Sequence, residues 1–248
     1  MAKRRKNPVE ITTTEVHMCS LDVRLRILRG LPFFETLTQA ELEQVNQRFH
    51  ERGYAPGEYL YLTGDPGERM FVVAEGRVRL LRLAASGRQV MLDLLIPGDF
   101  FGALGPQTQP HPDTAQAQTN VCALTISVED FRAVLQDYPS VALRLLDAVA
   151  SRLREAHDAI HLLGSGSAEQ RIAHTLLKLG RKLGQPDEVG LLIQTPLGRD
   201  ELAEMTGVTP ETASRVISQF QRAGWIDTGR QWVALKDREA LEEVLESS

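Results

Sequence analysis

The fold is decided by the stretch Arg199-Asp-Glu-Leu-Ala-Glu-Met-Thr-Gly-Val-Thr-Pro-Glu-Thr-Ala-Ser-Arg-Val-Ile-Ser218. Its apolar and small side chains fall at positions that would face a core shared by two helices: Leu202, Ala203, Val208, Ala213, Val216 and Ile217. Gly207 lies where the chain must turn sharply, and a positive φ is favourable there only for glycine. Thr209 can cap the second helix, and Pro210 fits the first turn, where no N–H is needed. The stretch therefore predicts a helix-turn-helix.

The second helix of this motif would carry polar side chains on its outward face. Arg215 is suited to a bidentate bond with guanine, Glu211 to accepting from the cytosine amino group, and Ser214 to lying near a thymine edge. The remaining polar residues are better suited to phosphates and sugars, which fix the register on DNA: Thr209, Thr212 and Gln219. An ordinary helical hairpin is the alternative, but turn, cap and polar face together favour DNA binding.

The composition limits the class of protein. A length of 248 residues allows one large domain or two small ones, each with its own core. The chain has no run of about 18 apolar residues, and no apolar segment follows the basic residues 3–6, so we expect neither a membrane span nor a secretory signal. Two cysteines are too few for a disulfide framework and fit a reducing cytoplasm. A net charge of −5 argues against indiscriminate coating of nucleic acid, but leaves sequence-specific binding open.

The residue pattern changes twice along the first half of the chain. Residues 1–20 are expected to form a flexible, partly basic arm, and residues 21–138 a domain of their own. This domain is expected to begin with a helix over Leu21–Leu31 and a second helix that starts at the capping box Thr38–Glu41. Short apolar runs separated by turn residues then predict an antiparallel barrel or jelly roll, with strands at Tyr59–Tyr61, Met70–Ala74, Val78–Leu83, Val90–Ile96 and Ala115–Ile126.

Residues 139–164 have helical periodicity. Apolar residues recur there at alternating spacings of four and three: Ala142, Leu146, Val149, Leu153, Ala156, Ile160 and Leu163. Such a heptad seam predicts a two-helix coiled coil between subunits, with the six residues from Leu146 to Leu163 in the dimer interface. The alternative is that this stripe packs on the barrel of its own chain. A second stripe at Val141 and Leu145 is available for that packing, so we favour dimerisation.

Residues 165–248 are expected to form a winged helix-turn-helix domain, which makes the predicted fold class α+β. Gly164-Ser-Gly166 would break the preceding helix as a hinge, and Ser167 with Gln170 forms a capping box for the next one. After the helix-turn-helix, two short apolar runs around Thr228-Gly229 predict the hairpin of a wing, which an amphipathic helix follows.

This order of elements resembles the cyclic-AMP receptor protein/FNR (CRP/FNR) family of bacterial transcription regulators, from about Leu31 to the C-terminus. In the barrel the resemblance rests on Gly57-Glu58, Gly64-Asp65, Phe71-Val72-Val73, Gly76-Arg-Val78 and Pro97-Gly-Asp-Phe-Phe-Gly102. It implies a cyclic-nucleotide-binding-like β-roll that senses a signal, a dimer helix that transmits it, and two recognition helices that enter successive major grooves.

The resemblance also implies a DNA site and partners. The Glu211-x-x-Ser214-Arg215 pattern is similar to that of FNR-type members and implies a TTGA-like half-site in an inverted repeat. The implied partners are double-stranded promoter DNA, a second copy of the chain and RNA polymerase, contacted by an activator. Two alternatives stay open: a repressor with the same DNA chemistry, and a ligand-binding module whose winged helix serves only as an interaction domain.

The candidate effector pocket departs from the family's cyclic-AMP pattern. Cyclic-AMP binders place a Glu after the Phe-Gly pair and an Arg-Ser pair further along the chain. Here Ala103 follows Gly102, and the Arg-Ser positions carry His111 and Pro112. The polar pair that the dimer helix offers to the base aligns with Ala156-His157, and no Lys or Arg lies between Arg88 and Arg132. We therefore expect no control by cyclic AMP, although His111 can in principle act as a weak cation.

Other signals are left open. The four-cysteine iron–sulfur cluster of FNR-like members is excluded within one chain, because only Cys19 and Cys122 are present. A thiol switch between them, or between subunits, stays open, although Cys122 alternates with Leu124 and Ile126 as a small core residue would. We assign no metal and no cofactor: His157 and His161 have metal-compatible spacing but are expected to be solvated or hydrogen-bonded. Control by haem, by thiol redox, by a cyclic nucleotide or by abundance alone is open, and no motif indicates an enzyme.

Overall fold

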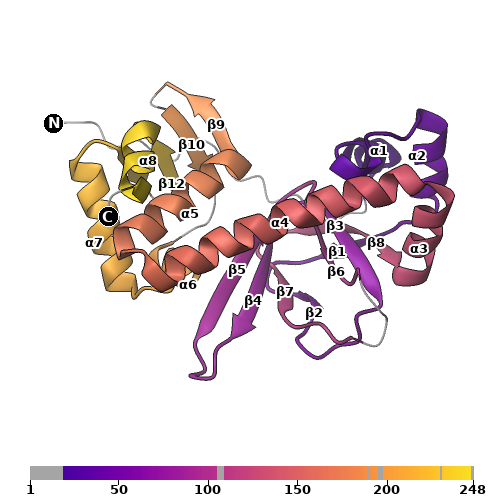
Figure 1. Cartoon of the computed structure of the whole chain (residues 1–248), viewed down its shortest axis with the longest axis horizontal. Helices are drawn as coiled ribbons and strands as arrows, with labels where there is room; N and C mark the ends of the chain where they lie inside the picture. Colours follow the sequence, from indigo (N-terminus) through magenta and orange to yellow (C-terminus); the bar gives the residue numbers. More distant parts are fainter. Residues whose placement is uncertain (1–18, 105–108, 189, 195–197, 230, 247–248) are drawn as a thin grey trace. The chain divides into compact units, whose positions relative to one another are not determined.

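The computed structural model describes residues 19–104, 109–188, 190–194, 198–229 and 231–246 (Figure 1). These residues form two compact units. One holds the described residues up to Arg154 and the other those from Glu155 onward. We describe each unit by itself.

The first unit begins with three short helices, two of which have a side-chain cap at their N-terminus. They are α1 (Leu21–Arg29), the 3-10 helix η1 (Pro32–Phe34) and α2 (Gln39–Asn46). The Ser20 side chain accepts a hydrogen bond from the backbone N–H of Val23, and Thr38 forms the expected capping box with Glu41. The first helix ends at Arg29, two residues earlier than expected, because Gly30 and Leu31 lead into the turn before Pro32.

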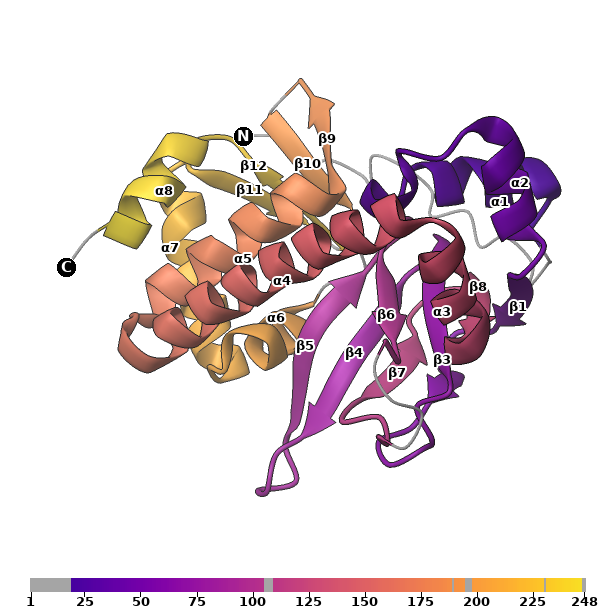
Figure 2. The same ribbon diagram turned by 45° about the vertical axis from the view of Figure 1, so that its right-hand side comes forward.

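Two four-stranded antiparallel sheets follow and form a β-roll, in agreement with the antiparallel barrel or jelly roll that the strand spacing predicted. Their orders are β1-β8-β3-β6 and β2-β7-β4-β5. The strands are β1 (His50–Tyr54), β2 (Tyr59–Tyr61), β3 (Arg69–Glu75), β4 (Val78–Leu83), β5 (Gln89–Leu95), β6 (Phe100–Gly102), β7 (Thr114–Ala117) and β8 (Val121–Ser127). Figure 2 gives a second view of these strands.

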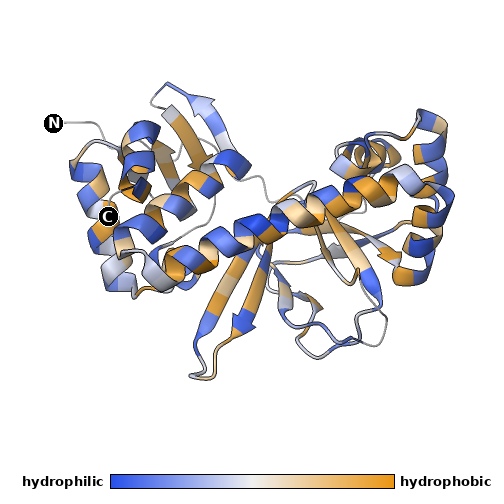
Figure 3. Cartoon of the chain, in the orientation of Figure 1, coloured by the Kyte–Doolittle hydropathy of each residue, from blue (hydrophilic) through white to orange (hydrophobic). Residues whose placement is uncertain are grey.

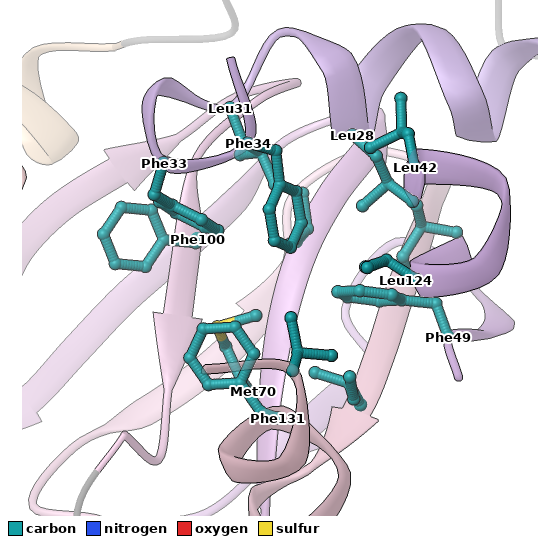
Figure 4. Close-up of a cluster of buried hydrophobic side chains, with 14 of the residues drawn as sticks. Leu28, Leu31, Phe33, Phe34, Leu42, Phe49, Met70, Phe100, Leu124 and Phe131 are labelled. Carbon is teal, nitrogen blue, oxygen red and sulfur yellow. The ribbon is translucent and has the colours of Figure 1, made fainter. Parts of the chain in front are cut away.

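In the sheet β1-β8-β3-β6, the inner strands β8 and β3 are buried on both faces along most of their length. Along β3, Met70 and Val72 join a core cluster with the helices, while Phe71 and Val73 join a second cluster inside the roll. The helix-side cluster gathers the fully buried aromatic rings, which meet edge to face at centroid separations of 4.7–6.3 Å (Figure 4). Burial of each such side chain contributes about 1.5–3 kcal/mol to stability.

Two helices follow β8 without a long loop. They are α3 (Val128–Asp137) and α4 (Pro139–Ser165). Ser127 caps α3 by accepting from the backbone N–H of Asp130. At the start of α4, Val141 is buried and Leu145 half-buried against the helix-side cluster, as expected for the second apolar stripe.

The second unit is a small sheet covered by helices. Its sheet order is β11-β12-β10-β9, and the amphipathic pattern of its helices can be followed in Figure 3. The elements are α5 (Ala168–Leu183), β9 (Gly184–Asp187), β10 (Gly190–Gln194), α6 (Arg199–Thr206), α7 (Pro210–Arg222), β11 (Ile226–Gly229), β12 (Trp232–Leu235) and α8 (Arg238–Glu246). The predicted capping box at Ser167 and Gln170 and the predicted hairpin after the helix-turn-helix are both confirmed.

The structure adds elements that the sequence pattern did not predict. The expected strand over Ala115–Ile126 is two strands, β7 and β8, which belong to different sheets. Strand β1 is polar and lies at a sheet edge, β6 has only three residues, and β9 is an edge strand that contains Pro186. Their side chains lack the alternation that marks a half-buried strand, and therefore these strands gave no periodic signal.

Candidate nucleic-acid interface and sensor interior

The helix-turn-helix has the geometry that its sequence predicts. Helix α6 ends at Gly207, which has φ +66° and ψ 22°, in the left-handed region that favours glycine. The Thr209 hydroxyl accepts from the backbone N–H of Thr212 at 3.2 Å, and Pro210 takes the first position of α7. The Arg171 guanidinium, on α5, donates to the carbonyl oxygen of Thr206 at 3.3 Å. The turn between α6 and α7 is therefore fixed from both sides.

Helix α7 separates an apolar face from a polar one. Ala213, Val216, Ile217 and Phe220 are almost fully buried beneath it. The outward side carries the exposed residues Glu211, Ser214, Arg215 and Gln219. Because side chains three and four residues apart share one face of a helix, Glu211, Ser214 and Arg215 form one contiguous surface.

The N-terminal end of α7 keeps Glu211 ionised. Hydrogen bonds from its own backbone N–H and from the Thr209 side chain hold the pKa of this carboxyl below its ordinary value. A carboxylate in this position can only accept hydrogen bonds, as a contact to a cytosine amino group requires. Thr209 and Thr212 already bond to each other at the cap through their hydroxyl oxygens, 3.2 Å apart.

The interior of the β-roll contains an aromatic stack around His111. The imidazole lies over the Tyr61 ring at a centroid separation of 3.7 Å and an interplanar angle of 11°. Phe71 and Phe101 pack beside Tyr61 at 5.6 and 6.1 Å, and the Tyr61 hydroxyl donates to Asp113 at 3.0 Å. His111 is only 6% exposed.

Burial and two carboxylates set the ionisation of this stack. Burial lowers the pKa of His111, against the opposing effect of the Asp113 and Asp65 carboxylates. Burial also raises the pKa of Asp113, against the Tyr61 hydrogen bond and the charges of His111 and Arg82, and raises that of Tyr61. His111 is therefore a buried imidazole near carboxylates, an environment that does not favour a phosphate.

The structure brings three of the four candidate pocket residues to one region. Gly102 ends β6 with φ +87°, and the backbone N–H of Ala103 donates to the carbonyl of Arg69. A Cβ added at Gly67 would lie 2.4 Å from the carbonyl oxygen of Gln109 and 3.3 Å from the Ala103 side chain, so the chain before His111 approaches Ala103 closely. The fourth candidate, His157, lies in the second unit and is exposed on α4.

Comparisons with known proteins match both units. Residues 51–138 match the cyclic nucleotide-binding domain family, and residues 170–244 match the Crp-like helix-turn-helix domain family. The chain is 33% identical over 218 residues to the cyclic AMP receptor protein of Thermus thermophilus, across 88% of this chain and 98% of that protein. It is 31% identical over 202 residues to the transcriptional activator protein FnrL of Cereibacter sphaeroides, across 79% and 81% of the two chains.

The chain belongs to the CRP/FNR family of transcription regulators. A solved structure of FixK2 from Bradyrhizobium japonicum has the same fold, with a TM-score of 0.71 and 27% identity over 81% of this chain and 98% of that one. The chain is therefore a DNA-binding transcription regulator with an α+β fold. The names of its relatives indicate regulation rather than catalysis.

In this CRP/FNR regulator the two cysteines are joined. Cys19 and Cys122 form a disulfide bond, with their Cα atoms 6.3 Å apart. Cys122 faces the helix-side core with Leu124 and Ile126, as expected, but Cys19 is also buried there and does not lie in a flexible arm. The next residue, Ser20, caps α1 by accepting a hydrogen bond from the backbone N–H of Val23. His17 and Met18 lie outside the described residues.

The predicted seam of the regulator's long helix is exposed. Leu146, Leu153, Ile160 and Leu163 each expose more than half of their surface, Val149 exposes 39%, and Ala156 is also exposed. Within the described chain no helix is long and apolar enough to cross a membrane. The same residues include no group of three or more His, Cys, Asp or Glu placed to hold a metal ion.

One contact to the long helix was missed by the sequence reading. The Arg152 guanidinium lies over the Phe100 ring at 3.7 Å from its centroid, and it also donates to the Phe100 carbonyl. A second nitrogen of this guanidinium is 3.8 Å from an Asp99 carboxylate oxygen. Arg152 thus connects α4 to the start of β6, the strand that ends at Gly102. The available signal was a cation next to seam residue Leu153.

We expect His111 to make the fold acid-sensitive. Its pKa is lowered in the folded state, so below about pH 6.5 the unfolded chain takes up a proton that the folded chain does not. The free energy of unfolding should therefore fall as the pH falls through this range. Asp113, whose folded pKa is raised, has the opposite effect closer to its ordinary value of about 4.

Urea unfolding followed by circular dichroism between about pH 8 and pH 5 measures this slope. The His111→Gln variant is expected to lose part of the slope, whatever its stability at neutral pH. The control variant His50→Gln replaces an exposed histidine of the same unit and should keep the slope. Equal slopes in His111→Gln and the unchanged protein would contradict the assignment.

Proposed function

We propose that this regulator is a homodimer that activates transcription from a TTGA-type inverted repeat and that it does so without cyclic AMP. The observation that carries the proposal is the exposed Glu211-Ser214-Arg215 surface of a capped and rigidly packed helix. In this proposal residues 21–138 form the sensor, 139–164 the dimerisation helix and 165–248 the DNA-binding domain. A cytoplasmic location follows from promoter DNA as the partner.

Base contacts follow from the chemistry of the three side chains. The Arg215 guanidinium has two parallel N–H donors that match the O6 and N7 acceptors of guanine. Glu211 accepts from the amino group of the paired cytosine, and the short Ser214 side chain leaves room for a thymine methyl. Thr209, Thr212 and Gln219 flank these three residues, where phosphates and sugars pass, and fix the position of the helix on DNA.

A second copy of the chain is the partner that the long helix requires. Large apolar side chains recur along one face of α4 and are exposed, whereas Val141 and Leu145 already pack on the sensor. A parallel coiled coil through the six seam residues would bury this face in both subunits. It would also place two recognition helices about one helical turn apart on DNA, as an inverted repeat requires.

Cyclic-AMP control is not favoured by the sensor interior. The relative from Thermus thermophilus is named a cyclic AMP receptor protein. In the present chain the position that binds phosphate in such proteins carries His111, which is buried in a stack and faces Asp113 and Asp65. An anionic phosphate there would meet two carboxylates instead of a bidentate guanidinium. The relative FnrL is named a transcriptional activator, and we propose that the present chain also activates transcription, by contacting RNA polymerase.

We expect the Arg215→Ala variant to lose about 1–3 kcal/mol of binding free energy on the inverted repeat, because it removes the guanine contact. Fluorescence anisotropy on the TTGA repeat and on repeats altered at the guanine measures both affinity and preference. The control Arg238→Ala removes an exposed arginine from α8 and should bind as the unchanged protein does. An equal loss on specific and scrambled DNA would rule out base reading by Arg215.

We expect Leu153→Glu to dissociate the dimer. The substitution removes the stabilisation from burying Leu153, about 1.5–3 kcal/mol per subunit, and places a charge in the seam. Sedimentation velocity over a concentration series measures the dissociation constant of the dimer. The control Arg154→Glu introduces the same side chain one residue along, away from the seam, and should leave the dimer intact. A Leu153→Glu dimer as stable as that of the control would show that the subunits associate elsewhere.

We expect cyclic AMP to change neither DNA affinity nor thermal stability. Anisotropy on the inverted repeat and thermal unfolding, each with and without millimolar cyclic AMP, test this expectation. The inverted repeat itself serves as the positive control, because a ligand that binds only the folded state raises the unfolding temperature. A rise in affinity or in unfolding temperature with cyclic AMP would contradict the proposed independence and would leave the DNA-binding assignment unaffected.

A further inference from the structure

The disulfide between Cys19 and Cys122 joins two parts of the sensor that are 103 residues apart in sequence. Cys19 lies directly before the cap of α1, and Cys122 lies near the start of β8. Both side chains are buried in the helix-side core, at 6% and 3% exposure. The bond therefore fixes the path of the chain into α1 against the central sheet.

We propose that this pair is a reversible thiol–disulfide site through which a small dithiol reductant or disulfide oxidant controls the DNA affinity of the regulator. The inference rests on the proposed function for its DNA readout, but the thiol chemistry has a readout of its own. A disulfide in a protein of a reducing compartment exchanges continually with small thiols. The fraction of the protein that carries the bond therefore depends on the ratio of thiols to disulfides in that compartment.

Release of the bond is expected to be a local event, because α1 has independent anchors. The Arg24 guanidinium donates to the Asn46 side chain at 3.0 Å and to the carbonyl oxygens of Asn46 and Phe49 at 3.1 and 2.7 Å. It also forms an ion pair with Glu51, and Leu28 is fully buried. These contacts hold α1 on α2 and β1 in either redox state. Reduction thus frees the entry to α1 and leaves the sensor folded.

The Cys122 end of the bond lies on β8, an inner strand of its sheet. Strand β8 pairs with both β1 and β3, and Cys122 is paired with Gly53 on one side and with Glu75 on the other. The β3 register shifts between Val73 and Glu75, so the bond meets the sheet at an irregularity. Making or breaking the bond at Cys122 therefore acts at an irregular point of the β3–β8 ladder.

Two routes lead from β8 to the long helix within the first unit. Along the chain, β8 ends at Ser127, which caps α3, and α4 follows α3. Across the sheet, β3 pairs with β6, whose Phe100 is clamped by Arg152 of α4. Both routes begin next to Cys122, which lies on β8 and pairs with Glu75 of β3. The redox state of the bond can thus be transmitted to the helix that carries the dimer seam.

The exchange is a balanced two-electron reaction. A thiolate of the reductant attacks Cys19 Sγ, the S–S bond breaks, and the Cys122 thiolate leaves and takes up a proton. The second thiol of the reductant loses its proton and attacks its own sulfur in the mixed disulfide, so that Cys19 is released and protonated and the reductant departs as a cyclic disulfide. Because both sulfurs are buried, the attack requires local opening at the start of α1. Oxidation by a small disulfide reverses each step.

The experiment equilibrates the full-length dimer with mixtures of reduced and oxidised dithiothreitol. Each sample is divided: one part is quenched with a maleimide and its alkylated cysteines are counted by mass spectrometry, and the other is measured by anisotropy on the TTGA repeat and on scrambled DNA. We expect Cys19 and Cys122 to become alkylated together in one transition. DNA affinity should change by at least about fivefold with the same midpoint.

The Cys19→Ala and Cys122→Ser variants should each bind DNA with an affinity that does not depend on the ratio of reduced to oxidised dithiothreitol. Cys19→Ala leaves β8 intact and so keeps the test valid if Cys122→Ser does not fold. A control variant, Ser20→Ala, removes the neighbouring cap and should keep the redox response.

Two outcomes would overturn the inference. Cysteines that stay alkylatable under every oxidising mixture would show that the bond does not form, and specific DNA binding of equal affinity in every mixture would show that it controls nothing. The second outcome leaves the proposed function intact. Loss of specific binding in every mixture would instead overturn the proposed function and the coupling with it, whatever the thiol titration gives.

Discussion

The first unit depends on one constraint, the burial of the inner strands β3 and β8 of the sheet β1-β8-β3-β6 on both faces. Successive side chains of β3 and β8 enter different cores, so a slip of one residue in register would exchange the two cores entirely. The two cores are filled by different sets of side chains, so they cannot be exchanged without voids on one side and overpacking on the other. The helices α1, α2 and α3 are positioned by this sheet, and their caps only determine where each begins.

The same alternation explains why the sensor interior departs from a nucleotide pocket. Phe71 on β3 points into the roll, where it packs with Phe101 and Tyr61, and the last of these rings stacks on His111. A guanidinium at position 111 would have to be buried beside Tyr61, with Asp113 accepting a hydrogen bond from that ring's hydroxyl. An imidazole that stays neutral fits this environment without an uncompensated charge. The departures at Ala103 and His111 thus belong to one self-consistent packing arrangement.

Sequence reasoning predicted what is local and missed what depends on distant partners. Signals that lie within four consecutive residues are all confirmed: the capping boxes at Thr38 and Ser167, the turn at Gly207 and the cap at Thr209. Helix α3 had such a signal in Ser127 and Asp130, which went unused. The polar edge strand β1, the Arg152 contact to Phe100 and the Cys19–Cys122 bond have no local signature. They arise only when segments far apart in the sequence meet.

The fixed position of α7 separates the reading of DNA sequence from its control. Its apolar face is buried, its N-terminus is capped by Thr209, and the turn before it is fixed by Gly207 and by Arg171. The side chains that would read bases therefore keep one arrangement whatever happens in the sensor. In the proposed dimer, a signal would change whether two recognition helices meet two half-sites together, and would not change which sequence each helix reads. Control would then act on the affinity for the whole repeat, through the helix that carries the predicted dimer seam. The contacts of Val141, Leu145 and Arg152 are where the sensor holds that helix.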